Sequence, residues 1–153
     1  MRIALVTLLG AIALTAPSVT GALAADKTDV ENELKKFHGV WTFVSVEAGG
    51  KEIPIDAFKG ITVAFEGDKY TVRKDDEVIQ SATQKLDPSK SPKTLDVTVT
   101  EGPHKGTVMP GIYEISADTL KVCFDPEGKK RPKEFKTASG SQTTLVVHKR
   151  MKK

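Results

Sequence analysis

The stretch Gly39-Val40-Trp41-Thr42-Phe43-Val44-Ser45 lies where the hydrophobic pattern of the chain changes its period. Before it, Val30, Leu34 and Phe37 recur at the spacing of one face of a helix. From Gly39 onward, apolar and polar residues alternate, which is typical of strands that bury one face and expose the other. The stretch therefore predicts the first strand of an all-β domain that follows one short helix.

The helical segment begins with a capping-box pattern, in which Thr28 is followed three residues later by Glu31. A helix of about two and a half turns with a single apolar stripe cannot be stable alone in water. We therefore expect it to lie against the mouth or the outer wall of the structure that the following strands form.

Short strands fill most of the remaining chain. Gly and Asp in the connections, as in Gly67-Asp68 and Asp75-Asp76, favour tight hairpins. We predict eight strands: Val40–Glu47, Ile61–Glu66, Lys69–Lys74, Val78–Leu86, Thr94–Thr100, Val108–Ser116, Leu120–Asp125 and Thr143–Arg150. This meander predicts an eight-stranded antiparallel up-and-down barrel, with a two-sheet sandwich as the alternative. Pro110, inside the sixth strand, predicts a bulge or a break.

The alternation also predicts which side chains point inward. The expected inward set is Phe43, Val63, Phe65, Tyr70, Val72, Leu95, Val97, Tyr113, Val122 and Phe124. Burying about ten such side chains, at roughly 1.5–3 kcal/mol each, gives a core adequate for one domain before entropy is subtracted. An eight-stranded barrel is just wide enough to be filled by such side chains or to hold one small ligand.

Residues 1–24 have the pattern of a signal peptide. Arg2 supplies a positive charge, Ile3–Ala16 is mostly aliphatic, and Ala22-Leu23-Ala24 offers small residues for cleavage. The alternative is an uncleaved membrane anchor, but the apolar segment is short for a span of about 20 residues. We expect an exported domain, residues 25–153, that is periplasmic or extracellular and has no membrane span after cleavage.

Charge and cysteine content exclude other classes. The full chain has a formal net charge of +3, which is too balanced to indicate a nucleic acid partner. Lys129–Arg131 and the basic C-terminal residues are expected to be a solvated loop and a frayed tail. Cys123 is the single cysteine, so it forms no intrachain disulfide, and we expect a small buried hydrophobic residue.

Several segments together resemble one known family. They are Gly39–Ser45 with Gly50-Lys51, Phe65–Val72, Lys85–Pro88, Gly111–Glu114, Asp118–Phe124 and Arg131–Phe135. The chain from about Leu34 to Arg150 resembles an uncharacterised lipocalin-like domain family found chiefly in planctomycete bacteria. The resemblance implies a lipocalin-like barrel, often exported, with no established reaction or ligand.

The resemblance also implies how the barrel is closed at one end. In lipocalins a tryptophan of the first strand closes the barrel, and an arginine from near the last strand packs over it. Gly39 and Trp41 match the first element, and Arg150 is the candidate for the second, with Lys149 as the alternative. A stack of Arg150 on Trp41 would be a cation–π contact of order 1 kcal/mol.

No constellation of side chains indicates catalysis. His38, His104 and His148 are expected to be exposed, and no zinc-type set accompanies them. The carboxylates lie in turns and on wet faces rather than in an inward pair suited to acid–base work. We therefore expect a protein that is not an enzyme and needs no cofactor or metal.

Two functions from different classes fit this reading. The first is a barrel of unknown specific role that binds a small apolar ligand in its interior, with Tyr70 and Tyr113 as hydrogen-bonding groups. The alternative is a barrel filled by side chains that acts as an extracytoplasmic protein-interaction or envelope module. In that case Lys129–Arg131 would provide the contact with an unknown protein partner.

Overall fold

The computed structural model describes residues 25–153, most of which lie in strands; the predicted signal peptide lies outside the described residues. The elements are α1 (Lys27–Phe37), β1 (Gly39–Ala48), β2 (Lys51–Ile53), η1 (Ile55–Phe58), β3 (Ile61–Glu66), β4 (Lys69–Lys74), β5 (Glu77–Asp87), β6 (Lys93–Glu101), β7 (Val108–Ile115), β8 (Thr119–Phe124) and β9 (Thr144–Arg150). Within this part of the chain, no helix has the length and apolar character needed to cross a membrane.

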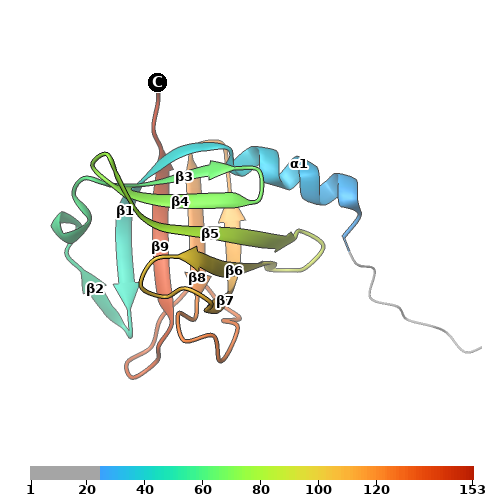
Figure 1. The fold of residues 1–153 in the computed structure, drawn as a ribbon. Helices are drawn as coiled ribbons and strands as arrows, with labels where there is room; N and C mark the ends of the chain where they lie inside the picture. Colours follow the sequence, from blue (N-terminus) through green and yellow to red (C-terminus); the bar gives the residue numbers. More distant parts are fainter. Residues whose placement is uncertain (1–24) are drawn as a thin grey trace, which may run out of the picture.

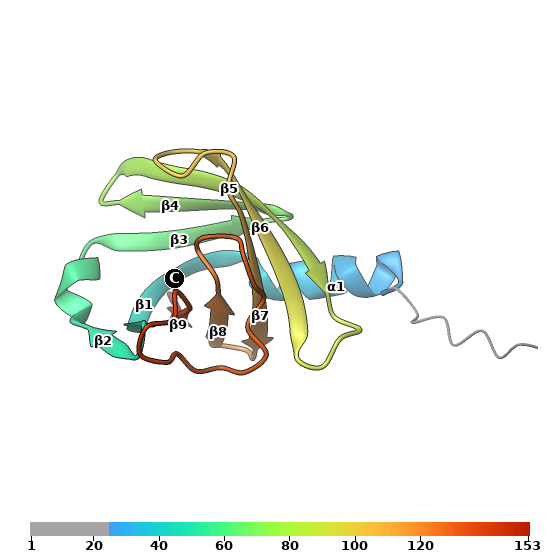
Figure 2. The same ribbon diagram turned by 90° about the horizontal axis from the view of Figure 1, so that it is seen from below.

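Eight of the strands form a closed antiparallel barrel, as the sequence predicts (Figures 1 and 2). Each strand from β3 to β8 pairs with the next along the chain, and β1 closes the ring between β3 and β9. Trp41 is opposite Val63 of β3 on one side and Arg150 of β9 on the other. Closure leaves only the short β2, paired to the far end of β1, as an edge.

The connections divide the barrel into two different ends. Tight turns after β3 and β7, the loop after β5 and the helix α1 lie at one end, which we call the closed end. The β2–η1 segment, the β4–β5 turn and the long loop before β9 lie at the other, the open end. The chain between β2 and β3 forms the single helical turn η1, whose Phe58 stacks on Phe43 with ring centroids 4.9 Å apart.

The helix α1 covers the closed end (Figure 1). Phe37, fully buried, packs edge-on against Phe65 and Tyr113, with centroid distances of 5.3 and 5.2 Å. The prediction that Thr28 caps the helix is wrong. Asp26 is the N-cap: its backbone is extended and its Oδ1 accepts a hydrogen bond from the Thr28 amide at 3.1 Å.

Trp41 and Arg150 connect the helix to the barrel. The Trp41 side chain is fully buried, and its Nε1 donates to the Phe37 carbonyl at 2.8 Å. The guanidinium carbon of Arg150 lies 4.2 Å from the centroid of the indole ring. Arg150 also donates to the carbonyl oxygens of His38, Lys36 (2.6 Å) and Ala117 (2.9 Å). One guanidinium therefore satisfies carbonyls at the end of α1 and in the β7–β8 turn.

Gly39 is required at the start of β1 for two reasons. Its φ is 126°, a backbone conformation that residues with a side chain rarely adopt. A Cβ added there would also lie 3.0 Å from Nη1 of Arg150. The glycine thus lets the chain turn from the helix into the strand directly beneath the guanidinium.

The prediction of a bulge or break at Pro110 is wrong. The β6–β7 register continues through Pro110, which is opposite Asp96. On its other side, pairing with β8 begins only at Gly111, although the Pro110 carbonyl accepts a bond from the Asp125 amide at 3.0 Å. The missing N–H therefore faces the side on which the ladder has already ended, where a proline is tolerated.

The long loop between β8 and β9 is not simply solvated, contrary to our expectation for Lys129–Arg131. Arg131 Nη1 donates to the carbonyls of Leu95 (2.8 Å) and Gly111 (2.7 Å), and its Nη2 pairs with Asp96 at 2.6 Å. Beneath this loop Cys123 is fully buried on the outer face of the barrel, as a small hydrophobic residue should be. Burial raises the pKa of its thiol to about 11, so the thiol stays protonated.

The closed-end contacts give a stability prediction with a matched control. Arg150→Met should lower the free energy of unfolding by about 2 kcal/mol, because three backbone carbonyls lose their donor and the indole of Trp41 loses the guanidinium stacked on it. Lys149→Met, one residue earlier and exposed, should change it by less than about 0.5 kcal/mol. Urea denaturation of the two variants measures the difference, and equal losses would contradict the assigned role of Arg150.

Trp41→Ala and Arg150→Ala should also be energetically coupled. Because the indole and the guanidinium stack and both bind the end of α1, the double variant should lose less stability than the sum of the single variants, by about 1 kcal/mol. A double-mutant cycle of unfolding free energies measures this coupling. Strict additivity would show that the two side chains act independently.

Candidate functional site

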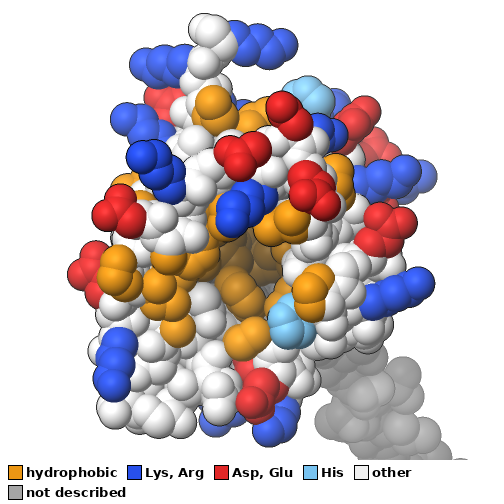
Figure 3. Space-filling model, turned by 60° about the vertical axis from the view of Figure 1, so that its left-hand side comes forward, with side chains coloured by type: hydrophobic (Ala, Val, Ile, Leu, Met, Phe, Trp, Pro, Cys, Tyr) orange, Lys and Arg blue, Asp and Glu red, His pale blue; other side chains and the backbone are white. Residues whose placement is uncertain are grey.

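The interior of the barrel contains a cavity of about 150 Å³. Seen from the end away from α1, the molecule is hollowed and the walls of the hollow are hydrophobic (Figure 3). The closed end is filled by the cluster around Phe37, Trp41 and Leu120, all fully buried. The space therefore remains in the part of the barrel nearer the open end.

The structure brings almost all of the predicted inward residues together around this cavity. The predicted residues in its wall are Phe43, Val63, Phe65, Tyr70, Val72, Leu95, Val97, Val122 and Phe124. The wall also contains Phe37, Gln84, Met109, Val146 and His148, which the sequence reasoning did not place there. Tyr113 is the predicted residue that does not line the cavity.

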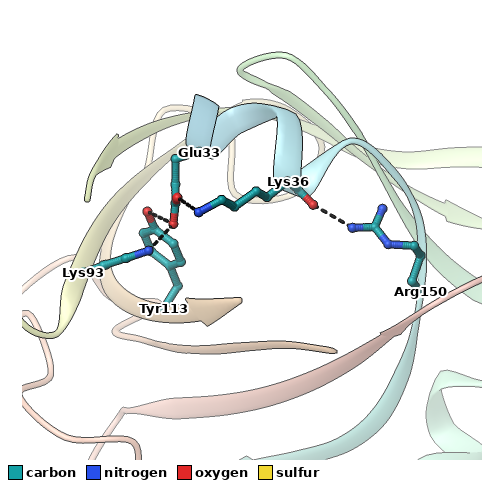
Figure 4. Close-up of polar contacts among 5 residues, drawn as sticks. All are labelled: Glu33, Lys36, Lys93, Tyr113 and Arg150. Carbon is teal, nitrogen blue, oxygen red and sulfur yellow. Dashed lines mark hydrogen bonds and ion pairs between the residues drawn. The ribbon is translucent and has the colours of Figure 1, made fainter. Parts of the chain in front are cut away.

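Tyr113 instead belongs to a polar cluster under α1 (Figure 4). Its hydroxyl donates to Oε1 of Glu33 at 3.2 Å, and Lys93 and Lys36 donate to the same carboxylate at 2.6 and 2.7 Å. Burial raises the pKa of Glu33, but the two lysines outweigh it, so the pKa is lowered overall. The cluster anchors the helix, and its tyrosine is not available to a molecule in the cavity.

Tyr70 is in the cavity wall, but its hydroxyl already has a partner. Gln80 Nε2 donates to the Tyr70 oxygen at 2.8 Å, and the ring stacks on Phe65 at 5.6 Å. Burial raises the pKa of Tyr70, so the phenol is neutral and keeps its own proton to donate.

Gln84 is the first polar group that our sequence reasoning missed. Its residue is only 5 % exposed, and both its Oε1 and its Nε2 are buried without a hydrogen-bond partner among the described residues. Buried amides normally have partners, because leaving one without a hydrogen bond costs about 1–3 kcal/mol. The pattern contained the signal: Ala82, Gln84 and Leu86 share one face of β5, and all three are buried.

His148 is the second missed group, and the prediction that it is exposed is wrong. It is 7 % exposed, lies 4.6 Å from Phe43 between ring centroids, and its Nδ1 has no partner within the described chain. Burial lowers its pKa to about 4, with a backbone bond to Thr42 opposing the shift in part. The signal was again strand alternation, since His148 is two residues from Val146 on the same face of β9, and both line the cavity.

The wall of the cavity carries no charge at neutral pH. None of its residues is Asp, Glu, Lys or Arg, and the lowered pKa keeps His148 neutral. Among residues 25–153, no group of three or more His, Cys, Asp or Glu side chains is arranged to hold a metal ion. The site thus offers apolar surface with one amide, one neutral imidazole and one phenol.

Comparison of the chain with models of protein families, with curated proteins and with solved structures finds no match in any of the three. The evidence for the closed barrel is therefore the strand pairing in the structure, not a likeness to another protein. Membership of the lipocalin-like family named above stays a prediction from the sequence.

Burial of neutral His148 should make stability depend on pH. Its folded-state pKa of about 4 lies below the unfolded value of about 6.5, so the unfolded chain takes up the proton first. Stability is therefore complete above about pH 6.5 and falls as the pH drops toward 4. Urea denaturation should show a loss of about 2 kcal/mol between pH 7 and pH 5.

His148→Phe is the control for this pH dependence. The variant should remove most of the loss between pH 7 and pH 5, whereas His104→Phe, at an exposed position, should leave it unchanged. The same slope in wild type and His148→Phe would show that another group is responsible.

Proposed function

We propose that this protein is an exported, non-enzymatic barrel that binds a small, largely apolar molecule in its interior. The observation that carries the proposal is the cavity of about 150 Å³ among the inward side chains. An eight-stranded barrel can be filled completely by its own side chains, so space left inside it favours a ligand. An engineered apolar cavity of about this size in another protein binds benzene.

The volume limits the size of the ligand. A single ring or a short branched chain fits inside, whereas a long acyl chain would have to extend beyond the open end. Exposed apolar residues occur on the elements at that end, with Ile55 at 43 %, Val78 at 44 % and Val108 at 47 % exposure. They offer an apolar surface that such a molecule would meet first.

The alternative, a filled barrel acting through its surface, has less support. A barrel with a cavity is not completely filled by its side chains. In the loop expected to contact a partner, Arg131 already binds the Leu95 carbonyl and the Asp96 carboxylate of β6. The non-enzymatic reading is supported by the chemistry of the cavity wall, which has neither an inward carboxylate pair nor a Ser or Cys nucleophile.

Native mass spectrometry of the protein purified from its own host tests the proposal. We expect an excess mass that is lost on denaturation. Val97→Phe, which adds a ring to the cavity wall, should abolish the excess mass, whereas Val40→Phe, at an exposed position on β1, should retain it. A bare wild-type chain that also fails to bind small aromatic probes would leave only the surface-acting alternative.

A further inference from the structure

The cavity is apolar except at a few atoms, and those atoms lack partners. The amide of Gln84 and Nδ1 of His148 are buried in its wall with no hydrogen-bond partner among residues 25–153. An apolar side chain at either position would avoid the cost of burying such a group. Buried polar groups normally have a partner, so these two groups favour a bound molecule in the cavity that supplies it.

The two groups lie on opposite walls. In the closed ring of strands, β5, which carries Gln84, is separated from β9, which carries His148, by three strands in either direction. A molecule between them contacts an amide on one side and an imidazole on the other. The Gln84 amide presents one donor and one acceptor group in a single plane, and the imidazole of His148 presents one further atom, Nδ1.

The absence of charge in the cavity wall disfavours charged ligands. No residue of the wall carries a charge at neutral pH, and the nearby carboxylate of Glu33 is already paired with Lys36 and Lys93 under the helix. A carboxylate or an ammonium group bound in the cavity would therefore be buried without a counter-ion, which is strongly unfavourable. A neutral polar group meets no such penalty.

From this arrangement we propose that the ligand is an uncharged molecule with a ring-sized apolar body and a hydrogen-bonding group of the carboxamide, lactam or phenol type that pairs with Gln84. This inference rests on the proposed function and names its ligand class. His148 supplies a second hydrogen bond from the opposite wall when the ligand carries a second polar atom. The remaining lining, such as Phe43, Val97 and Phe124, provides the apolar contact.

Three single-ring probes separate the inference from the function on which it rests. Benzamide is neutral and polar, benzoate has nearly the same shape but a charge, and toluene is apolar. Calorimetric titration of the full chain at pH 7 should show benzamide binding at least about 100-fold more tightly than benzoate, because only benzoate buries a charge.

Gln84→Met tests the assigned partner with almost no change in side-chain size. It should weaken benzamide about tenfold or more while leaving toluene unchanged or tighter, because only benzamide loses a hydrogen-bonding partner. Gln142→Met, the same change at an exposed loop position, should leave all three probes unaffected. His148→Phe should reduce toluene binding as well, since the larger ring occupies part of the cavity.

The outcomes are distinct. Binding of toluene with no preference for benzamide over benzoate, or an unchanged benzamide affinity in Gln84→Met, would overturn the ligand class and leave the binding function standing. Failure of all three probes to bind wild type, with the fold intact by circular dichroism, would overturn both. Equal weakening of toluene and benzamide by Gln84→Met would show that the residue acts only by packing.

Discussion

The structure depends on the pairing of its first strand with its last. β1 and β9 are far apart in the sequence, yet their pairing converts an open meander into a ring without free long edges. The same pairing brings Arg150 over Trp41 and places its guanidinium beside the end of α1. The pairing that closes the sheet therefore also holds the helix over one end of the barrel, through a few residues near the two ends of the folded domain.

This arrangement leaves the two ends of the barrel chemically different. At the closed end, polar groups such as Glu33 and Tyr113 are satisfied by one another and by lysines (Figure 4). In the cavity, Gln84 and His148 are buried without partners within the described residues. Polar groups are thus paired with one another where α1 packs, and the polar groups without partners lie where space remains.

Much of this could be predicted from the sequence because strand alternation is a local property. The period of two identified the eight strands of the barrel, though not the short β2, and most of the cavity wall, from Phe43 to Phe124. The prediction failed where the polar character of a residue was given more weight than its position in the alternation. We expected His148 to be exposed because histidine is polar, although alternation places it on the same face of β9 as the buried Val146. Gln84 was overlooked for the same reason.

Other features depend on contacts that no local pattern encodes. Arg131 bonds to β6 and β7 across the outer face, and the loop that it holds buries Cys123. Helix α1 is capped by Asp26 rather than by Thr28, because the backbone of Asp26 is extended and lets its carboxylate reach the amide of Thr28. The size of the cavity is likewise set by how the side chains of the whole ring meet, which hydrophobic spacing cannot give.

A crystal structure of the protein purified from its own host tests the central claim most directly, because it shows what occupies the barrel. The account predicts density for a ring-sized, non-protein molecule in the cavity, with a polar atom within hydrogen-bonding distance of the Gln84 amide. A barrel in which the side chains meet and leave no such space, with the Gln84 amide bonded to the protein, would contradict it.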